Sequence, residues 1–233
     1  MRAEDRDEGL SLSRVSFRRG AVDVVRNQTR TFARGETAVV TGSNGVGKST
    51  LLQLCAGLLP PRQGEVRLGG HRLAGMRPSS LVAQGIRRGC VFQQGGLVAN
   101  LSALANVGLP LRYHADVLDL SSRVIDARAR FCLGALGIAA TDLHALPGRL
   151  SFGIRKRVAF ARAMALEPNF VFFDDPDAGL DEENAEVIRQ VLVSYRDDPA
   201  VTMVVAAHQP DLIALLDRPV YELVGGALVR QQQ

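Results

Sequence analysis

The sequence predicts an α/β protein that carries a helical insertion. Short apolar runs alternate with amphipathic helical stretches at both ends of the chain, while the middle is predominantly helical. The chain has 233 residues, of which 46% are apolar and 22% are charged. This length and composition suffice for one large domain with a packed core. They exclude a disordered chain and a small disulfide-stapled scaffold.

The first third of the chain is predicted to be mainly β-structure. Val15 and Phe17 alternate with polar residues, and the apolar run 37–41 leads directly into a glycine-rich segment. We expect a helix from Lys48 to about Gly57, because a pair of prolines shortly afterwards blocks its continuation. Two further strands are predicted at 65–68, before a Gly-Gly turn, and at 90–93.

The middle of the chain is predicted to be helical. Ser121 or Ser122 can cap a helix that ends near Gly137. The apolar face of this helix is predicted to consist of Val124, Ile125, Phe131 and Cys132. A second helix is expected to begin near Ser151 and to end before Pro168.

The last third alternates between strands and helices again. Buried strands are predicted at 170–173 and 201–206, and a hairpin is predicted at 220–229 over Gly225-Gly226. A helix is expected to begin at Asp181, with Glu182, Glu183 and Glu186 in its first turns, where the helix dipole favours negative charge.

The domain organisation is predicted to be simple. Residues 1–10 are expected to form a flexible tail, because the start of the chain is charged and lacks the apolar core of a signal peptide. Residues 11–233 are expected to form a single domain, with a helical subdomain at about 95–165 inserted in the α/β core.

Charge and cysteine content exclude several classes of function. With 28 basic and 24 acidic residues, the net charge of +4 does not favour nucleic acid as a partner. Cys55, Cys90 and Cys132 are scattered, which indicates a reducing compartment and neither zinc nor disulfides. The uncharged stretch 89–111 is interrupted by polar residues and by Pro110, so we expect no membrane span there. Membrane association would then depend on a partner.

A complete P-loop follows the run 37–41. Its residues are Gly42, Ser43, Asn44, Gly45, Val46, Gly47, Lys48 and Ser49, and Thr50 comes next. Glycines let backbone N–H groups surround a β-phosphate at a helix N-terminus. Lys48 can reach the β- and γ-phosphates, and Ser49 offers a hydroxyl to Mg²⁺. The alternative is a glycine-rich turn that matches by chance, and the flanking strand and helix argue against it.

The apolar run 170–173 ends in two adjacent acids, Asp174 and Asp175. In a parallel sheet, the carboxyl end of such a strand faces the ligand crevice. Asp174 is therefore predicted to be the second Mg²⁺ anchor. The alternative interpretation is a strand-ending acidic turn before Pro176, and the P-loop earlier in the sequence argues against it.

Further motifs give the chain a family resemblance over nearly its whole length. They are Phe92-Gln93, Leu150-Ser151-Phe152-Gly153-Ile154, Asp174-Asp175-Pro176, Ala178-Gly179-Leu180-Asp181 and His208. In this order they resemble the Q-loop, signature, Walker B, D-loop and H-loop motifs of ATP-binding subunits of ABC transporters. The resemblance implies a P-loop NTPase core, with a mixed sheet and flanking helices, that carries an ABC-type helical subdomain. Segments 92–114 and 150–169 are most similar to the ATPases paired with MCE proteins in bacterial lipid transport of the Mla type.

The resemblance also implies roles for individual residues. The phosphates of ATP would be bound by Gly42, Ser43, Asn44, Gly45, Val46, Gly47, Lys48, Ser49 and Thr50 of one subunit and by Ser151 and Gly153 of the other. Mg²⁺ would be held by Ser49, Gln93 and Asp174. Hydrolysis would depend on Asp175, His208 and Gln93, and Asp181 would link the two ATP sites.

The partners are implied in the same way. The chain would hydrolyse ATP within a head-to-tail dimer, formed with a second copy or with a different ATP-binding subunit, and would power a membrane permease. An MCE-type substrate-binding protein is a further expected partner, and no nucleic acid is expected. The implied location is peripheral, on the cytoplasmic face of the bacterial inner membrane. The segment Gly95–Leu111 is either ordinary helical-domain core or part of the groove that receives the permease's coupling helix.

Three departures from the family pattern bear on activity. Asp175 stands where the family usually has Glu, and the missing methylene shortens its reach by about 1.5 Å. Phe152 replaces a signature glycine, so its ring either packs on its own helical domain or holds the dimer interface ajar. The aromatic residue that usually stacks on adenine is missing, and Arg18 or Arg19 lies near its place.

These departures leave two other classes of function open. One is a hydrolysis-poor subunit that binds nucleotide and regulates a complex, which Asp175 and Phe152 favour and the intact P-loop opposes. The other is a DNA-repair or chromosome ATPase of the same fold. Such proteins usually insert coiled coils or zinc modules, and the sequence has neither a heptad run nor a cysteine cluster.

Overall fold

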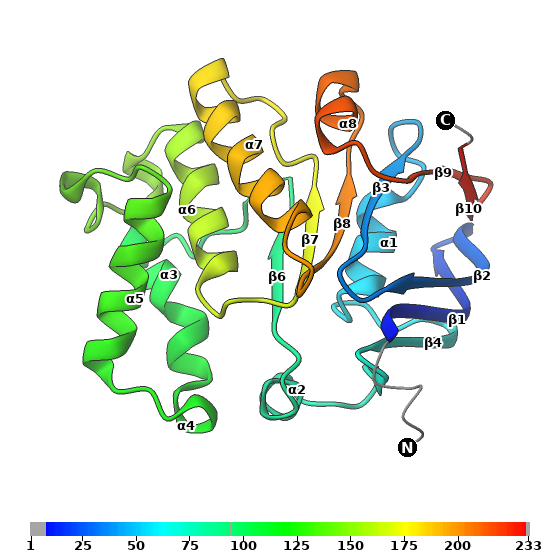
Figure 1. Ribbon diagram of the computed structural model, residues 1–233, viewed down its shortest axis with the longest axis horizontal. Coiled ribbons are helices and arrows are strands. Elements are labelled where there is room, and N and C mark those ends of the chain that lie inside the picture. Colours follow the sequence, from blue (N-terminus) through cyan, green and yellow to red (C-terminus); the bar gives the residue numbers. More distant parts are fainter. Residues whose placement is uncertain (1–7, 94, 232–233) are drawn as a thin grey trace.

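Two β-sheets and a block of helices make up the part of the chain described by the computed structural model, residues 8–93 and 95–231 (Figure 1). The strands are β1 (Glu8–Arg19), β2 (Val22–Ala33), β3 (Thr37–Thr41), β4 (Gln63–Leu68), β5 (His71–Arg72), β6 (Arg88–Val91), β7 (Phe170–Asp174), β8 (Thr202–Ala206), β9 (Val220–Val224) and β10 (Ala227–Arg230). The helices are α1 (Lys48–Cys55), α2 (Pro78–Ala83), α3 (Ala103–Tyr113), α4 (Ala115–Leu118), α5 (Ser122–Ala135), α6 (Phe152–Met164), α7 (Glu182–Arg196) and α8 (Pro210–Leu216). The predicted α/β class is confirmed.

The larger sheet has six strands in the order β10-β9-β3-β8-β7-β6. Its neighbouring strands pair in parallel from β9 through to β6, and only β10 is antiparallel, in the predicted hairpin with β9. The smaller sheet, in the order β2-β1-β4-β5, is antiparallel. Because β3, β7 and β8 run in the same direction, the loops that follow them meet at one edge of the larger sheet.

The central strands are buried on both faces. All residues of β7 and β8 are buried, which is typical of parallel strands covered by helices. Val171 and Phe173 pack into the core with α6 and α7, while Phe170 and Phe172 pack into the core with α1 and the smaller sheet. The two-residue period of a strand therefore divides this apolar run between two cores.

The helical block consists of α3, α4, α5 and α6, and it lies beside the larger sheet (Figure 1). Buried Asn106 on α3 fixes the loop that leads into the block. Its side chain accepts a hydrogen bond from the N–H of Val98 and donates to the carbonyls of Val98, Leu101 and Ser102. None of the helices in the described part of the chain has the length and apolar character needed to cross a membrane.

The start of the chain corrects one boundary. Residues 8–10, which were expected to belong to a flexible tail, form the beginning of β1, and Leu10 is fully buried. Leu10 is ordered because β1 lies between two strands: it pairs with Phe32 of β2 and with Leu68 of β4. Residues 1–7 of the expected tail lie outside the described residues.

Two further details differ from the sequence expectations. On α5, Ile125 and Cys132 are buried, but Val124 is 47% and Phe131 76% exposed. Adjacent helical residues point about 100° apart, so the face that α5 buries against α3 and α6 is too narrow for all four side chains. Strand β6 ends at Val91, two residues earlier than expected, and Gln93 lies in the following loop.

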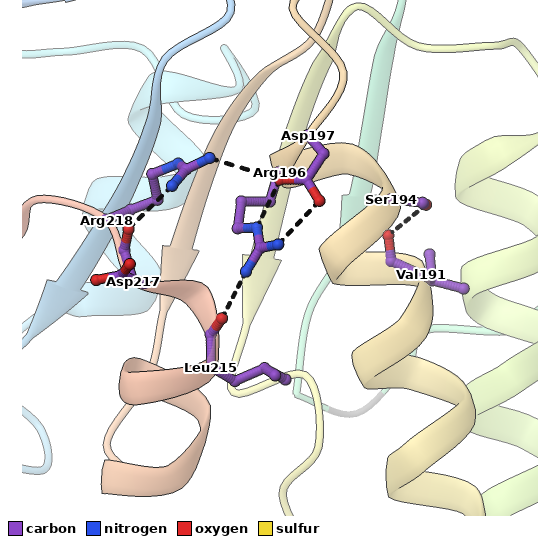
Figure 2. A network of polar contacts seen from close by, with 7 residues as sticks. All are labelled: Val191, Ser194, Arg196, Asp197, Leu215, Asp217 and Arg218. Carbon is purple, nitrogen blue, oxygen red and sulfur yellow. Dashed lines mark hydrogen bonds and ion pairs between the residues drawn. The ribbon is translucent and has the colours of Figure 1, made fainter.

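The C-terminal end of α7 is fastened to its surroundings by polar contacts near the surface (Figure 2). Arg196 forms an ion pair with Asp197 at 2.8 Å and donates to the carbonyl of Leu215 on α8 at 2.7 Å. Arg218 approaches the same carboxylate to 3.5 Å. These contacts join α7 to α8 at the end of α7 opposite Asp181.

Candidate nucleotide site

The P-loop connects β3 to α1 as the sequence predicts. Gly47 caps α1 in the left-handed conformation with φ 115°, and Gly42 has φ 139°. A Cβ atom at Gly47 would lie 2.1 Å from Cγ1 of Val24, so both backbone conformation and space require glycine there. Because the cap has no side-chain oxygen, the N–H groups at the start of α1 can bind an anion such as a phosphate.

Two side chains at the start of α1 carry polar groups into the site. Lys48 is buried, and its ammonium donates to the carbonyls of Gly42 at 2.8 Å and Ser43 at 3.3 Å, which holds the charge within the loop. The Ser49 side chain forms a hydrogen bond with buried Asp174 at the end of β7. The P-loop and the strand-ending acid therefore meet.

The pair Ser49 and Asp174 has the chemistry of a magnesium site. Burial raises the pKa of Asp174, and the hydrogen bond from Ser49 partly opposes this rise. A divalent cation would offset the buried negative charge, and Mg²⁺ prefers hydroxyl and carboxylate oxygens of this kind. The residues present therefore fit Mg²⁺. Gln93, the third predicted ligand, is exposed in the loop after β6.

Asp175 and His208 contact each other directly. Nδ1 of His208, two residues beyond β8, lies 2.7 Å from Oδ1 of Asp175, directly after β7. The two adjacent strand ends thus bring together two residues predicted to act in hydrolysis. Asp175 has φ 45°, an uncommon conformation for a residue with a side chain, and its N–H donates to the carbonyl of Ala206 at 2.9 Å.

A second group of predicted residues lies where α6 and α7 begin. Ser151 caps α6 by accepting a hydrogen bond from the N–H of Ile154 at 3.2 Å. Asp181 caps α7 by accepting from the N–H and the side-chain amide of Asn184, which lowers the pKa of Asp181. A Cβ atom at Gly153 would lie 2.4 Å from the side chain of Asn184. Asn184 therefore packs the signature segment against the D-loop within one chain.

The Phe152 side chain lies to one side of this group. A Cβ atom at Gly179 would meet its ring at 3.4 Å, and the guanidinium of Arg155 lies 5.9 Å from its centroid. The ring therefore lies beside the D-loop of its own chain, and the side chain is 43% exposed. At the expected adenine position, Arg18 pairs with Asp23 and donates to the carbonyl of Ala21, whereas Arg19 is exposed at the end of β1.

Lys156 and Asn184 belong to the site but were not among the predicted residues. Lys156 is buried on α6, and its ammonium donates to the carbonyls of Asp175 at 3.1 Å and Gln93 at 3.4 Å. One sequence signal could have identified it, because the chain contains only two lysines, Lys48 and Lys156. Asn184 gives no such signal, since its role depends on how α6 and α7 pack.

The comparisons with known proteins agree with this geometry. The family described as "ABC transporter" matches residues 25–178. The intermembrane phospholipid transport system ATP-binding protein MlaF of Escherichia coli (strain K12) is 32% identical over 204 residues, which cover 87% of this chain and 74% of MlaF. The lipoprotein-releasing system ATP-binding protein LolD of Chromohalobacter salexigens is 39% identical over 185 residues, 79% of this chain and 76% of LolD.

A solved structure extends the match to three dimensions. The dimeric structure of a post-hydrolysis state of the ATP-binding cassette MJ0796 bound to ADP and Pi superposes with a TM-score of 0.84 at 28% identity. The superposition covers 96% of this chain and 98% of that structure's chain. On these matches, the chain belongs to the ABC transporter family, as an ATP-binding and ATP-hydrolysing subunit.

Proposed function

We propose that this chain hydrolyses MgATP at a dimer interface and powers a membrane permease that moves lipids or lipid-linked molecules. The observation that carries the proposal is the meeting of P-loop, acid and histidine at one sheet edge: Ser49 with Asp174, and Asp175 with His208. The cargo class rests on the names of the relatives, which act on phospholipids and on lipoproteins.

The nucleotide would be held mainly by the P-loop. Backbone N–H groups of residues 42–50 and the ammonium of Lys48 would bind the phosphates, and Ser49, Asp174 and Gln93 would hold Mg²⁺. When bound, Mg²⁺ supplies positive charge that offsets the negative charge of the phosphate oxygens. Lys48 would move from the carbonyls of Gly42 and Ser43 to the phosphates.

Asp175 and His208 would act on the attacking water. Phosphoryl transfer needs little covalent help from the protein, so catalysis depends on positioning and on charge stabilisation. Asp175 would orient the water and accept its proton, and His208 would hold the Asp175 carboxylate and contact the γ-phosphate. Because Asp175 is about 1.5 Å shorter than a glutamate, we expect slow basal hydrolysis.

A second ATP-binding subunit would complete each site. No hydrogen bond joins Ser151, Gly153 or Asp181 to the P-loop in the described part of the chain, and these residues lie at the starts of α6 and α7. In a head-to-tail dimer, Ser151 and Gly153 would reach the ATP of the other subunit, and Asp181 would link the two sites. The dimeric form of the matched cassette supports this arrangement.

The permease would dock beside the loop after β6. A cavity of about 270 Å³ is lined there by Gly95, Gly96, Leu97, Pro147 and Phe152, together with Arg155 and Lys156. Its position at the helical block supports the role of the segment Gly95–Leu111 in receiving a coupling helix. The chain would then lie on the cytoplasmic face of the inner membrane, held by the permease, with an MCE-type protein as a further partner of the complex.

Purification of the chain together with its membrane partners tests this function. The partners should be a permease and an MCE-type protein, and ATP turnover by the complex should rise when lipid is supplied. Copurification with a permease but no ATP turnover by the complex would instead favour the regulatory, hydrolysis-poor role. Partners without any membrane protein would contradict the transport function.

A further inference from the structure

Lys156 lies between two loops of the candidate site, and the roles proposed above do not use it. The residue is 2% exposed, and its ammonium donates to the backbone carbonyls of Asp175 and Gln93. Lys156 is on α6, the helix that begins at the signature residue Ser151. One side chain therefore touches the loop after β7, the loop after β6 and the cavity beside the helical block.

The Asp175 backbone needs such support. Its φ of 45° is sterically disfavoured for a residue with a Cβ atom, and such conformations persist where the surroundings fix them. The N–H of Asp175 donates to the carbonyl of Ala206 at 2.9 Å, and its own carbonyl accepts from Lys156 at 3.1 Å and from the N–H of Ala178 at 3.3 Å. His208 contacts Oδ1 of the Asp175 carboxylate, so both the backbone and the side chain of this residue are held.

The same helix also holds the loop after β6. The guanidinium of Arg162 donates to the carbonyls of Gly96 at 2.9 Å and Gly95 at 3.0 Å. Lys156 adds the carbonyl of Gln93. This loop therefore rests on α6 through two basic side chains, of which only Lys156 also contacts Asp175.

The charges around Lys156 favour its ammonium form. Burial lowers the pKa of Lys156, but the carboxylates of Asp175, Asp174 and Asp177 oppose this shift. Removal of this buried cation would release the carbonyl of Gln93 and leave the carbonyl of Asp175 with the longer bond from Ala178. It would also increase the repulsion among the three carboxylates.

We propose that Lys156 is a positioning residue that fixes the backbone of Asp175 and ties it to the loop after β6. A displacement of that loop by a docked partner would then change the position of the Asp175 carboxylate directly. This inference rests on the proposed role of Asp175 in hydrolysis.

Three variants of the full-length chain test the inference. Lys156→Met keeps the approximate length of the side chain and removes its charge and its hydrogen-bond donors. Lys156→Arg keeps the charge and the donors. Arg162→Met is the matched control, because it releases the loop after β6 without touching Asp175. For each, kcat and KM for ATP, the affinity for a fluorescent ATP analogue and the melting temperature are measured.

For Lys156→Met we expect kcat to fall about tenfold or more, with KM and nucleotide affinity within about twofold of wild type. A misplaced catalytic group slows the chemical step but leaves the binding of ATP unchanged. Lys156→Arg should fall between Lys156→Met and wild type, and Arg162→Met should lose less than Lys156→Met.

Two results would overturn the inference. A kcat of Lys156→Met within about twofold of wild type means that Asp175 needs no support from this side chain. A parallel loss of kcat, affinity and melting temperature, without recovery in Lys156→Arg, means that Lys156 only stabilises the fold. Asp175→Asn tests the role of Asp175 by itself: if this variant hydrolyses ATP as fast as wild type, the proposed role of Asp175 in hydrolysis is wrong, whatever the result for Lys156→Met.

Discussion

The two ends of helix α7 differ in how they use charge. Near its start, the candidate site buries Lys48, Lys156 and Asp174 and holds Asp175 in a disfavoured backbone conformation. At its far end, Arg196, Asp197 and Arg218 form ion pairs near the surface, with Asp197 exposed (Figure 2). Both ends make polar contacts, but only those near the start of α7 involve buried charges and a disfavoured backbone conformation.

The two groups of charges have different roles. Exposed ion pairs are screened by water and contribute little to stability. Buried charges are costly, and proteins keep them where geometry matters for function. Substitutions at the site should therefore lower ATP turnover strongly, whereas substitutions at the far end of α7 should change turnover and stability little.

The largest effect is expected for Lys48→Ala. This substitution removes the ammonium that we propose binds the phosphates, so MgATP affinity or turnover should fall by at least about 10²-fold. Binding of a fluorescent ATP analogue and steady-state hydrolysis measure the two quantities. Arg196→Ala is the matched control, since it removes a basic side chain remote from the site. Unchanged affinity and turnover in Lys48→Ala would contradict the proposal that the P-loop binds the phosphates of ATP.

Asp175 should show the next largest effect, and in both directions. Asp175→Asn cannot accept a proton, so hydrolysis should slow by about 10²-fold, while Asp175→Glu restores the longer reach and should speed turnover. A single-turnover assay with bound ATP isolates the chemical step. If the asparagine variant hydrolyses at the wild-type rate, Asp175 does not orient or deprotonate the water.

Residues that directly follow an apolar run could be predicted from the sequence, whereas residues placed by packing could not. The P-loop, Asp174 and His208 follow apolar runs directly, so local patterns place them at one sheet edge. Lys156 is different, because its contacts with Asp175 and Gln93 depend on how α6 packs against two loops. The burial of Leu10 likewise depends on pairing with strands distant in sequence.

The direction of the Phe152 side chain also could not be predicted from the local sequence. The sequence left two conformations open, and the ring lies near Gly179 and Arg155 of its own chain. Side-chain direction at a helix start depends on neighbours that no local pattern specifies. The side chain lies beside the D-loop and is 43% exposed, so its effect on the dimer interface stays a prediction.

A smaller effect is therefore expected for Phe152→Gly. Because the ring already lies beside its own D-loop, its removal should change ATP-driven dimer formation by less than tenfold, which is about 1.4 kcal/mol. Sedimentation with a hydrolysis-deficient background, such as Asp175→Asn, measures the dimer without turnover. A gain of tenfold or more would show that the phenylalanine restrains the interface and that the regulatory role is the better description.

The smallest effect is expected at the far end of α7. Arg196→Ala removes the ion pair with Asp197 and the hydrogen bond to Leu215, yet the melting temperature at pH 7 should change by no more than about 2 °C. The Arg196 guanidinium lowers the pKa of Asp197 in the folded chain. The stability that this ion pair contributes is therefore fully present above the pKa of an aspartate in the unfolded chain, about 3.9. It is lost as the pH falls through the lower pKa of Asp197 in the folded chain. The difference between variant and wild type should accordingly be largest near neutral pH and shrink in acid, with ATP turnover unchanged. A decrease above about 5 °C, or a loss of turnover, would mean that the surface contacts around Arg196 also set the position of Asp181 and Asn184 at the other end of the helix.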